Sequence, residues 1–278
     1  MPHDIFRVER PDEQTLPVVV DVPHAGEWIP DDADEEMVVG DRLLRRDLDL
    51  YVDRFWTDAP SCGATLVASN VSRYVVDLNR APDDVSPEAV DGAEKKYEPG
   101  YYQERGVVWR ETTGGTPVMD GPMTPEAFEA RLQRFYYPYH RALEDEIERV
   151  RRQFGHCILV DGHSMPSKGR SGHSDPGQRR ADIVPGDADG TACERTVRWA
   201  VEEHYRDHGY SVRSNDPYKG GWITHHYGMP ADSIHAIQIE VNRDLYMDEK
   251  SFEIKDDGLA KLRESCAGLL PKLAELDL

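Results

Sequence analysis

The amino-acid sequence predicts one α/β domain with a mainly parallel sheet and helices on both faces. Short apolar runs alternate along the chain with segments of helical periodicity, which is typical of this class. Neither an internal repeat nor a sharp change in composition divides the 278 residues. Because α/β domains of about 200–250 residues are common, we interpret residues 1–278 as a single domain.

The first half of the chain begins this alternation. Residues 16–22 (LPVVVDV) form an apolar run typical of a buried strand, and residues 43–56 place apolar side chains near one helical face. Two further strands are expected at residues 64–69 and 73–78, the second ending at an Asn-Arg-Ala-Pro turn. The pattern predicts a βα unit followed by two strands.

A long loop and a long helix follow. Residues 81–122 are rich in Pro, Gly, Asp and Glu and show weak periodicity, which indicates a long excursion over the surface. Long loops inside compact domains are usually binding loops or disordered segments, so this excursion could cover a site. From Pro125 to Val150 apolar side chains repeat at three and four residues, which predicts a long helix kinked near Pro138.

The second half continues the pattern. Residues 156–161 (HCILVD) and 235–242 (HAIQIEVN) are expected to form strands. The sequence pattern of residues 191–208 predicts an amphipathic helix, and that of residues 258–276 predicts a C-terminal helix bent at Pro271. A turn at Gly220-Gly221 should precede the last strand.

The composition excludes several classes of function. A formal net charge of −20 argues against binding to nucleic acid or to an anionic membrane, because both need a basic surface. The N-terminus lacks the apolar segment of a signal peptide, and the apolar runs are far shorter than the ~18 residues that a membrane span needs. Four cysteines occur singly, which indicates reduced thiols. We therefore expect a cytoplasmic protein with a small-molecule substrate; its oligomeric state is not predicted.

The acidic residues suggest an adaptation to high salt. Asp supplies 30 of the 53 acidic residues, and Lys supplies only 8 of the 33 basic ones. We expect the free energy of unfolding to rise steadily with molar salt, because counterions screen the repulsion between surface carboxylates. Denaturant unfolding at increasing KCl concentration measures this dependence. Full stability in dilute buffer would contradict it.

Three side chains of the kind found in metal sites occur where apolar strands end. They are His24 in VDVPHAG, His163 in ILVDGHS and Glu240 in IQIEVNR. The carboxyl ends of parallel strands share one edge of a sheet, where α/β proteins bind their ligands, so the three should converge. Histidine is the commonest metal ligand, and imidazoles with a carboxylate make a catalytic zinc site. The alternative is that each is an ordinary hydrogen-bonded structural residue.

The spacing does not decide which carboxylate completes the metal site. Glu27 forms an HxxE motif with His24, and Asp47 and Asp49 follow in RRDLDLY. All three could instead belong to a solvated acidic face.

Two arginines could serve a substrate. Arg73 and Arg80 flank the segment SRYVVDLNR, and an arginine beside the site can hold a carboxylate or polarise a scissile carbonyl. Surface ion pairs are the alternative. Weaker candidates lie beside the Gly220-Gly221 pair: Lys219, Thr224, His225, His226 and Tyr227.

Four motifs together resemble those of a known family. VPHAGEWIP, SRYVVDLNRAP, LVDGHS and YKGGWITHHYGMPADSIHAIQIEVNRDLYMDE are similar to motifs of N-formylglutamate amidohydrolases, in the same order, over most of residues 16–249. The resemblance implies a three-layer α/β/α fold of the phosphorylase/hydrolase-like, zinc-exopeptidase type, shared with zinc carboxypeptidases and aspartoacylases. It also implies Zn²⁺ or another divalent metal, and hydrolysis of N-formyl-L-glutamate to formate and L-glutamate, a step of histidine degradation.

The resemblance also implies roles for the metal-site residues. His24 and His163 match the metal-ligating histidines, and Glu240 matches the glutamate that activates water at the metal. Members of the family commonly carry another residue at the position of Glu27 but keep an aspartate at that of Asp49. Asp49 is therefore favoured as the third ligand, with Glu27 as the alternative.

The substrate-binding roles follow in the same way. Arg73 is placed like the arginine that polarises the scissile carbonyl, and Asn79 and Arg80 resemble the pair that binds the substrate carboxylate in the aspartoacylase relatives. An aspartoacylase-like or carboxypeptidase-like hydrolase of another N-acyl amino acid is the nearest alternative function. A catalytically inactive protein that binds acidic amino acids is an alternative of another class.

Overall fold

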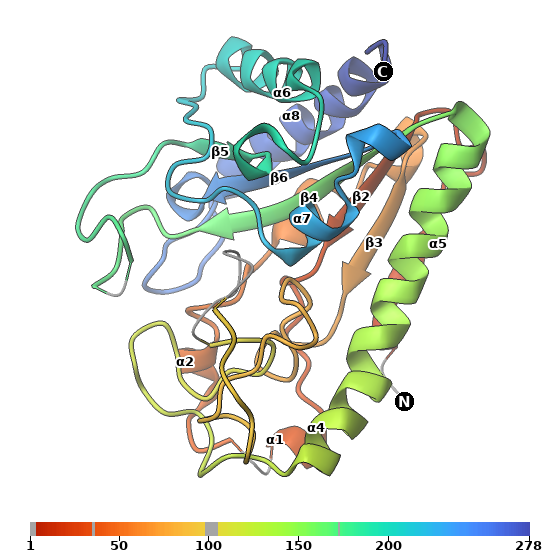
Figure 1. Cartoon of the computed structure of the whole chain (residues 1–278). Coiled ribbons are helices and arrows are strands. Elements are labelled where there is room, and N and C mark those ends of the chain that lie inside the picture. The colour runs from red at the N-terminus through yellow and green to blue at the C-terminus, as the bar shows by residue number, and fades with distance from the viewer. Residues whose placement is uncertain (1–3, 35–36, 98–104, 172) are drawn as a thin grey trace.

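The computed structural model describes residues 4–34, 37–97, 105–171 and 173–278, and within them a six-stranded sheet forms the centre of the molecule (Figure 1). The strand order is β1-β3-β2-β4-β6-β5. The four inner strands are parallel, whereas β1 and β5 run antiparallel at the two edges. This confirms the mixed, mostly parallel sheet. The strands are β1 (Phe6–Glu9), β2 (Val18–Val22), β3 (Thr65–Ser69), β4 (Cys157–Met165), β5 (Ile183–Gly186) and β6 (Ile234–Asn242).

The central strands are buried along their whole length. Every residue of β2, β4 and β6 is buried, as a parallel sheet covered on both faces requires. Among the polar side chains of these strands, the register places Asp21 beside Asp161 and Asp161 beside Gln238. Because residues paired in register point to the same face, the three form a polar row across one face of the sheet.

Helices of very different lengths connect and cover the strands. They are α1 (Asp31–Asp34), α2 (Asp41–Leu44), α3 (Val52–Phe55), α4 (Pro125–Arg131), α5 (Tyr137–Phe154), α6 (Arg195–Asp207), α7 (Trp222–Tyr227) and α8 (Asp256–Ala274). Single 3₁₀ turns occur at Pro60–Cys62, Ala188–Gly190, Pro230–Asp232 and Arg243–Leu245.

The helices lie on both faces of the sheet (Figure 1). Tyr139 of α5 hydrogen-bonds Asp21 and Thr224 of α7 hydrogen-bonds Asp161, so both helices cover the face with the polar row. On the opposite face, the position of Gly162 in β4 lies against Trp56 at the end of α3. Helix α8 packs on α3 and on α6. The helical layers expected on both sides of the sheet are therefore present.

The long helix is continuous but contains one irregular turn. Helix α4, a π-helical turn at Leu132–Tyr136 and helix α5 follow without a break. The N–H of Tyr137 donates to the carbonyl of Leu132, and Pro138 comes next. Proline has no N–H to donate to the carbonyl four residues earlier, so the helical pattern must change near it. The irregularity expected at Pro138 is thus a π turn just before it.

The continuous helix predicted over residues 43–56 is wrong. Helix α2 ends at Leu44, and α3 begins only after Tyr51, whose φ of 68° lies in the left-handed region. Between them the N–H of Asp49 donates to the carbonyl of His24 at 3.0 Å. The segment buries apolar side chains without being helical, which explains why its spacing resembled a helical face.

The strand predicted over residues 73–78 is also wrong. The segment forms turns, in which the N–H of Val75 donates to the carbonyl of Ser72 at 2.9 Å. The N–H of Asp77 donates to the carbonyl of Val107 in the long excursion, at 2.8 Å. The apolar residues here are buried by this loop and not by pairing within the sheet.

The excursion itself is packed and not merely superficial. Within its described residues, 81–97 and 105–122, there is no helix or strand, as expected. It nevertheless buries Val90, Val107, Trp109 and Met119 in the hydrophobic core. The excursion is therefore part of the packed core of the molecule.

The remaining elements differ mainly in extent. Strands β1 and β5 and helix α7 were not predicted, and α6 begins at Arg195 rather than at residue 191. Strand β4 extends through His163, which therefore lies inside the strand and not after it. The C-terminal helix is confirmed as α8, with Pro271 inside it. None of the helices in the described part of the chain is long and apolar enough to cross a bilayer.

Candidate metal centre and active site

A cavity of about 720 Å³ opens at the carboxyl ends of the inner strands. His163 near the end of β4, Glu240 near the end of β6 and His24 just after β2 all line it, as the sequence predicted. Three loops complete its walls: the excursion, the segment before β5 and the segment before α7. Further lining residues are Asp49, Arg73, Asn79, Arg80, Arg105, Trp109, Arg170, Arg180, Tyr218, Lys219, His225 and Arg243.

Two histidines and an aspartate converge at the base of the cavity. The Nδ1 atom of His163 lies 3.0 Å from Asp49 Oδ2, and the Nδ1 atom of His24 lies 3.6 Å from the same oxygen. The candidate ligand atoms of the three residues all lie within 4.8 Å of one another, and all three side chains are buried. In the described part of the chain, no other group of His, Cys, Asp or Glu side chains is gathered in this way.

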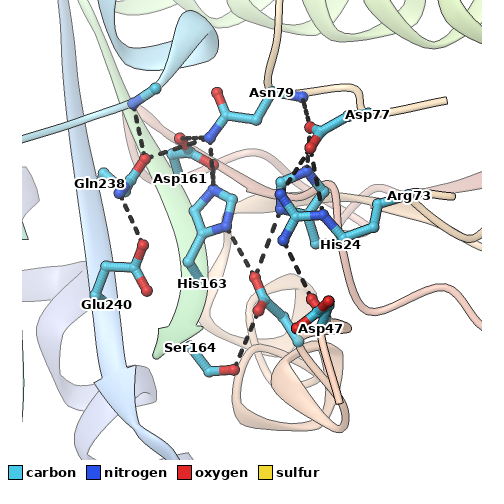
Figure 2. Close-up of polar contacts among 12 residues, drawn as sticks. His24, Asp47, Arg73, Asp77, Asn79, Asp161, His163, Ser164, Gln238 and Glu240 are labelled. Carbon is cyan, nitrogen blue, oxygen red and sulfur yellow. Dashed lines mark hydrogen bonds and ion pairs between the residues drawn. The ribbon is translucent and has the colours of Figure 1, made fainter. Parts of the chain in front are cut away.

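Each histidine is held from behind by a buried carboxylate (Figure 2). His24 Nε2 lies 2.7 Å from Asp77 Oδ1, and His163 Nε2 lies 2.7 Å from Asp161 Oδ1. A proton on His24 Nε2, directed at Asp77, leaves the Nδ1 lone pair of His24 directed toward Asp49. His163 presents its Nδ1 lone pair to Asp49 in the same way when its Nε2 proton is directed at Asp161. This arrangement of carboxylate, histidine and cation is usual in metal sites, where it fixes the tautomer of the ligand.

The donor set fits a divalent cation. His24 Nδ1 is buried and has no hydrogen-bond partner, so nothing in the protein uses its lone pair. Burial by itself would lower the pKa of His163, but Asp161 and Asp49 outweigh it and raise that pKa well above its usual value. The surroundings therefore favour a positive charge between these side chains. Two imidazole nitrogens and one carboxylate, with the open cavity on the remaining side, are a group that could hold a metal ion and leave one position open.

A buried arginine orients the aspartate. Arg243 Nη2 donates to Asp49 Oδ1 at 2.9 Å, and the Ser164 hydroxyl donates to the same oxygen at 3.3 Å. The other oxygen, Oδ2, is thereby directed at the histidines. Although burial opposes it, the neighbouring His163 and His24 and the charge of Arg243 hold the pKa of Asp49 well below its usual value. Asp49 is an anion fixed in a ligand's orientation.

The two other carboxylates considered as ligands lie elsewhere. Asp47 is buried, and it accepts hydrogen bonds from the Tyr74 hydroxyl at 2.7 Å, the N–H of Thr113 at 2.8 Å and Arg170. It thus ties three wall segments together. The side chain of Glu27 is 47% exposed and pairs with Arg45 at 3.1 Å. The structure does not bring Glu27 together with the histidines.

Glu240 lies beside the trio on the neighbouring strand. The register pairs it with His163, so the two side chains share a face of the sheet. Its Oε1 accepts a hydrogen bond from Gln238 Nε2 at 3.0 Å, and Gln238 Oε1 accepts one from the N–H of Gly221 at 2.9 Å (Figure 2). Burial is the main cause that raises the pKa of Glu240 to about 7, with Asp49 adding to it. A carboxyl group with this pKa can both accept and release a proton near neutral pH.

The predicted substrate residues occupy one side of the cavity. Arg73 Nη2 donates to Asp77 at 2.7 Å and Nη1 donates to the carbonyl of Asp47 at 3.2 Å. Asn79 is engaged by the protein: its Oδ1 accepts from the N–H of Ile223 at 2.8 Å, and its Nδ2 lies 3.0 Å from His163 Nε2. Arg80 lines the cavity beside them.

Of the weaker candidates beside the Gly220-Gly221 pair, some line the cavity and others point into the protein from helix α7. Lys219 and His225 line the cavity, whereas Thr224 donates to Asp161 at 3.3 Å and so supports the carboxylate behind His163. Sequence reasoning missed the supporting residues Arg243, Asp77, Asp161 and Gln238. A signal existed for Asp161, since a carboxylate that follows an apolar run inside a buried strand is costly unless it is paired.

Comparisons with known proteins agree with one another. The family model described as N-formylglutamate amidohydrolase matches residues 16–247. An N-formylglutamate deformylase of Pseudomonas putida is 32% identical over 246 residues, 87% of this chain and 86% of that protein. One of Pseudomonas aeruginosa is 32% identical over 85% of this chain and 84% of that protein. The crystal structure of an N-formylglutamate amidohydrolase from Ralstonia eutropha JMP134 superposes with a TM-score of 0.86 at 34% identity and covers 97% of each chain.

Proposed function

Because the chain belongs to the N-formylglutamate amidohydrolase family, we propose that it hydrolyses N-formyl-L-glutamate to formate and L-glutamate with the help of a divalent metal, Zn²⁺ or another. The observation that carries the proposal is the convergence of His24, Asp49 and His163 beside Glu240 in one cavity. His24 and His163 would hold the cation through Nδ1, and Asp49 through Oδ2. When bound, such a cation lowers the pKa of a water molecule to about 7 and polarises a carbonyl group.

Glu240 moves the proton in this proposal. Its carboxylate takes a proton from the attacking water, and the new bond forms between the water oxygen and the formyl carbon. The bond from that carbon to nitrogen then breaks, and Glu240 returns the proton to the departing amine. The hydrogen bond from Gln238 keeps the carboxylate in one orientation through both transfers.

Arg73 and Arg80 would contact the substrate, whereas Asn79 would hold a residue of the site in place. Arg73 is fixed by Asp77 and by the carbonyl of Asp47, so it can present a donor to the formyl oxygen as charge develops there. Arg80 would bind a substrate carboxylate. We assign Asn79 to positioning His163, because its Oδ1 accepts from the N–H of Ile223 and its Nδ2 lies against His163 Nε2.

The same proposal covers the finer fold type and the extent of the domain. A mostly parallel sheet with metal-type residues at the carboxyl ends of its strands agrees with the zinc-exopeptidase type. We propose that residues 1–278 form one domain of this type.

A hydrolysis panel tests the activity. We expect selective hydrolysis of N-formyl-L-glutamate among the N-formyl, N-acetyl and N-succinyl derivatives of Glu, Asp and His. Chelation should abolish the activity and added Zn²⁺ should restore it, because the proposed reaction depends on the cation. Preference for another acyl group would indicate a different N-acyl amino acid hydrolase. Absence of bound metal together with no hydrolysis after Zn²⁺ addition would indicate a binding protein.

A further inference from the structure

The excursion and the segment before it give one wall of the cavity three arginines and a tryptophan. Arg73, Arg80, Arg105 and Trp109 all line the cavity. The guanidinium of Arg73 lies 4.3 Å from the centre of the Trp109 ring, and that of Arg105 lies 5.5 Å from it. Trp109 is 3% exposed, so the ring is a fixed support for both arginines.

Of the three arginines, only Arg73 forms a close ion pair with a buried carboxylate: its Nη2 lies 2.7 Å from Asp77 Oδ2. The Nη1 atom of Arg80 donates to the carbonyl of Asn79 at 2.7 Å, while its Nε is buried without a hydrogen-bond partner. Among the described residues, no carboxylate forms an ion pair with Arg80. In a chain with 53 acidic and 33 basic residues, a cavity-lining arginine that forms no ion pair with a described carboxylate is available to an external anion.

Arg105 shows the same imbalance. Its Nη2 lies 3.6 Å from Glu111 Oε1, in a loose pair whose acidic side chain is 41% exposed. Its Nε is buried without a hydrogen-bond partner, and so is Trp109 Nε1. Buried N–H donors without acceptors are costly, and an anion bound at this wall would supply acceptors.

The charges of these arginines act on one another and on Asp77. The charges of Arg73 and Arg80 act on Asp77 behind His24: burial opposes them, but they help to hold the pKa of Asp77 well below its usual value. Burial is the main cause that lowers the pKa of Arg80; Arg73 and Arg105 add to it, whereas Asp77 and Asp84 oppose it. Arg105 and Arg80 line the same cavity and contribute positive charge to its wall. Because neither arginine belongs to the converging trio, an anion held by them is a part of the substrate other than the amide that is cleaved.

We propose that Arg105, together with Arg80, binds the side-chain carboxylate of a dicarboxylic N-acyl amino acid. Trp109 positions the Arg105 guanidinium. Arg105 thereby selects an acidic side chain over its neutral amide, since a site built around a charge rejects an analogue without that charge. This inference rests on the proposed function for the identity of the substrate but concerns a different residue and a different property, the preference for glutamate over glutamine.

Binding and turnover of Arg105→Gln test the inference. With the metal-loaded protein, calorimetry should show that wild type binds L-glutamate more tightly than L-glutamine. The substitution should weaken binding of L-glutamate by about 10- to 100-fold and leave L-glutamine little changed, because only the former loses a charged hydrogen-bond partner. Arg134→Gln, which removes a surface arginine paired with Asp32, is the matched control and should alter neither affinity.

The outcomes separate this inference from the proposed function. The inference is overturned if the ratio of the L-glutamate affinity to the L-glutamine affinity is the same in Arg105→Gln as in wild type. This holds whether the two affinities equal those of wild type or are both lower. The same holds if wild type shows no preference for glutamate. Turnover of N-formyl-L-glutamate by wild type tests the function separately: Arg105-dependent glutamate binding without turnover would contradict the function and support the inference.

Discussion

Replacing Glu240 by Gln is expected to lower kcat by roughly 10²- to 10⁴-fold, the usual contribution of a general acid-base group. The amide keeps the shape of the side chain and can still accept the hydrogen bond from Gln238. It cannot take a proton from water or return one to the amine. Because Glu240 is not one of the three converging ligands, bound metal should stay at the wild-type level. Steady-state kinetics and elemental analysis of the same preparation measure both quantities.

The matched control is Glu264→Gln on the exposed surface of α8, which removes the same charge far from the cavity and should leave kcat unchanged. Near-normal turnover in Glu240→Gln would contradict the assignment. Loss of metal from that variant would instead place Glu240 among the ligands.

The pH profile gives the same assignment a second readout. Glu240 must be ionised to accept a proton, and burial raises its pKa to about 7. In wild type kcat/KM should therefore fall as the pH drops through this pKa, and a bound cation would move the fall to lower pH. The residual activity of Glu240→Gln should lack this acid limb. An unchanged limb in the variant would show that another group titrates.

The sequence was sufficient to predict the convergence of His24, His163 and Glu240. Each lies at or near the carboxyl end of an apolar strand, and parallel strands bring those ends to one edge. The third ligand could not be identified without the path of the backbone between α2 and α3. Spacing alone left Asp47 and Asp49 as competing candidates, but the irregular backbone before α3 directs Asp49 to the histidines and Asp47 to the loops.

The supporting residues could not be predicted from spacing. Asp77, Asp161 and Arg243 act through partners far away in the sequence, and only the register of the sheet and the path of the excursion bring them together. The edge strands β1 and β5 were missed for another reason. Each has four residues and pairs antiparallel with one neighbour, so neither is long enough to show a clear period.

The last prediction separates the two carboxylates between which the sequence could not choose. Asp49→Asn should lower the affinity for Zn²⁺ by more than about 100-fold, because replacing even an outer partner of a ligand typically costs about 10- to 100-fold. Glu27→Gln should leave the affinity unchanged, since Glu27 pairs with Arg45 at the surface. Competition with a chromophoric chelator measures both affinities. Loss of Zn²⁺ from Glu27→Gln but not from Asp49→Asn would reverse the assignment.

The variant Asp77→Asn provides an intermediate reference for the loss of Zn²⁺ affinity in Asp49→Asn. Asp77 holds His24 from behind without joining the trio, so its loss should reduce the affinity for Zn²⁺ by about 10- to 100-fold, less than the loss of Asp49. Asp49→Asn also leaves the buried Arg243 without its carboxylate, so unfolding of each metal-free variant must be measured alongside. If all three variants remain folded, we expect the largest loss of Zn²⁺ affinity for Asp49→Asn, a smaller loss for Asp77→Asn and none for Glu27→Gln. This order would identify Asp49 as the ligand, Asp77 as a residue that positions His24, and Glu27 as a residue without a role at the metal. Equal losses for Asp49 and Asp77 would mean that Asp49 acts only by positioning the histidines.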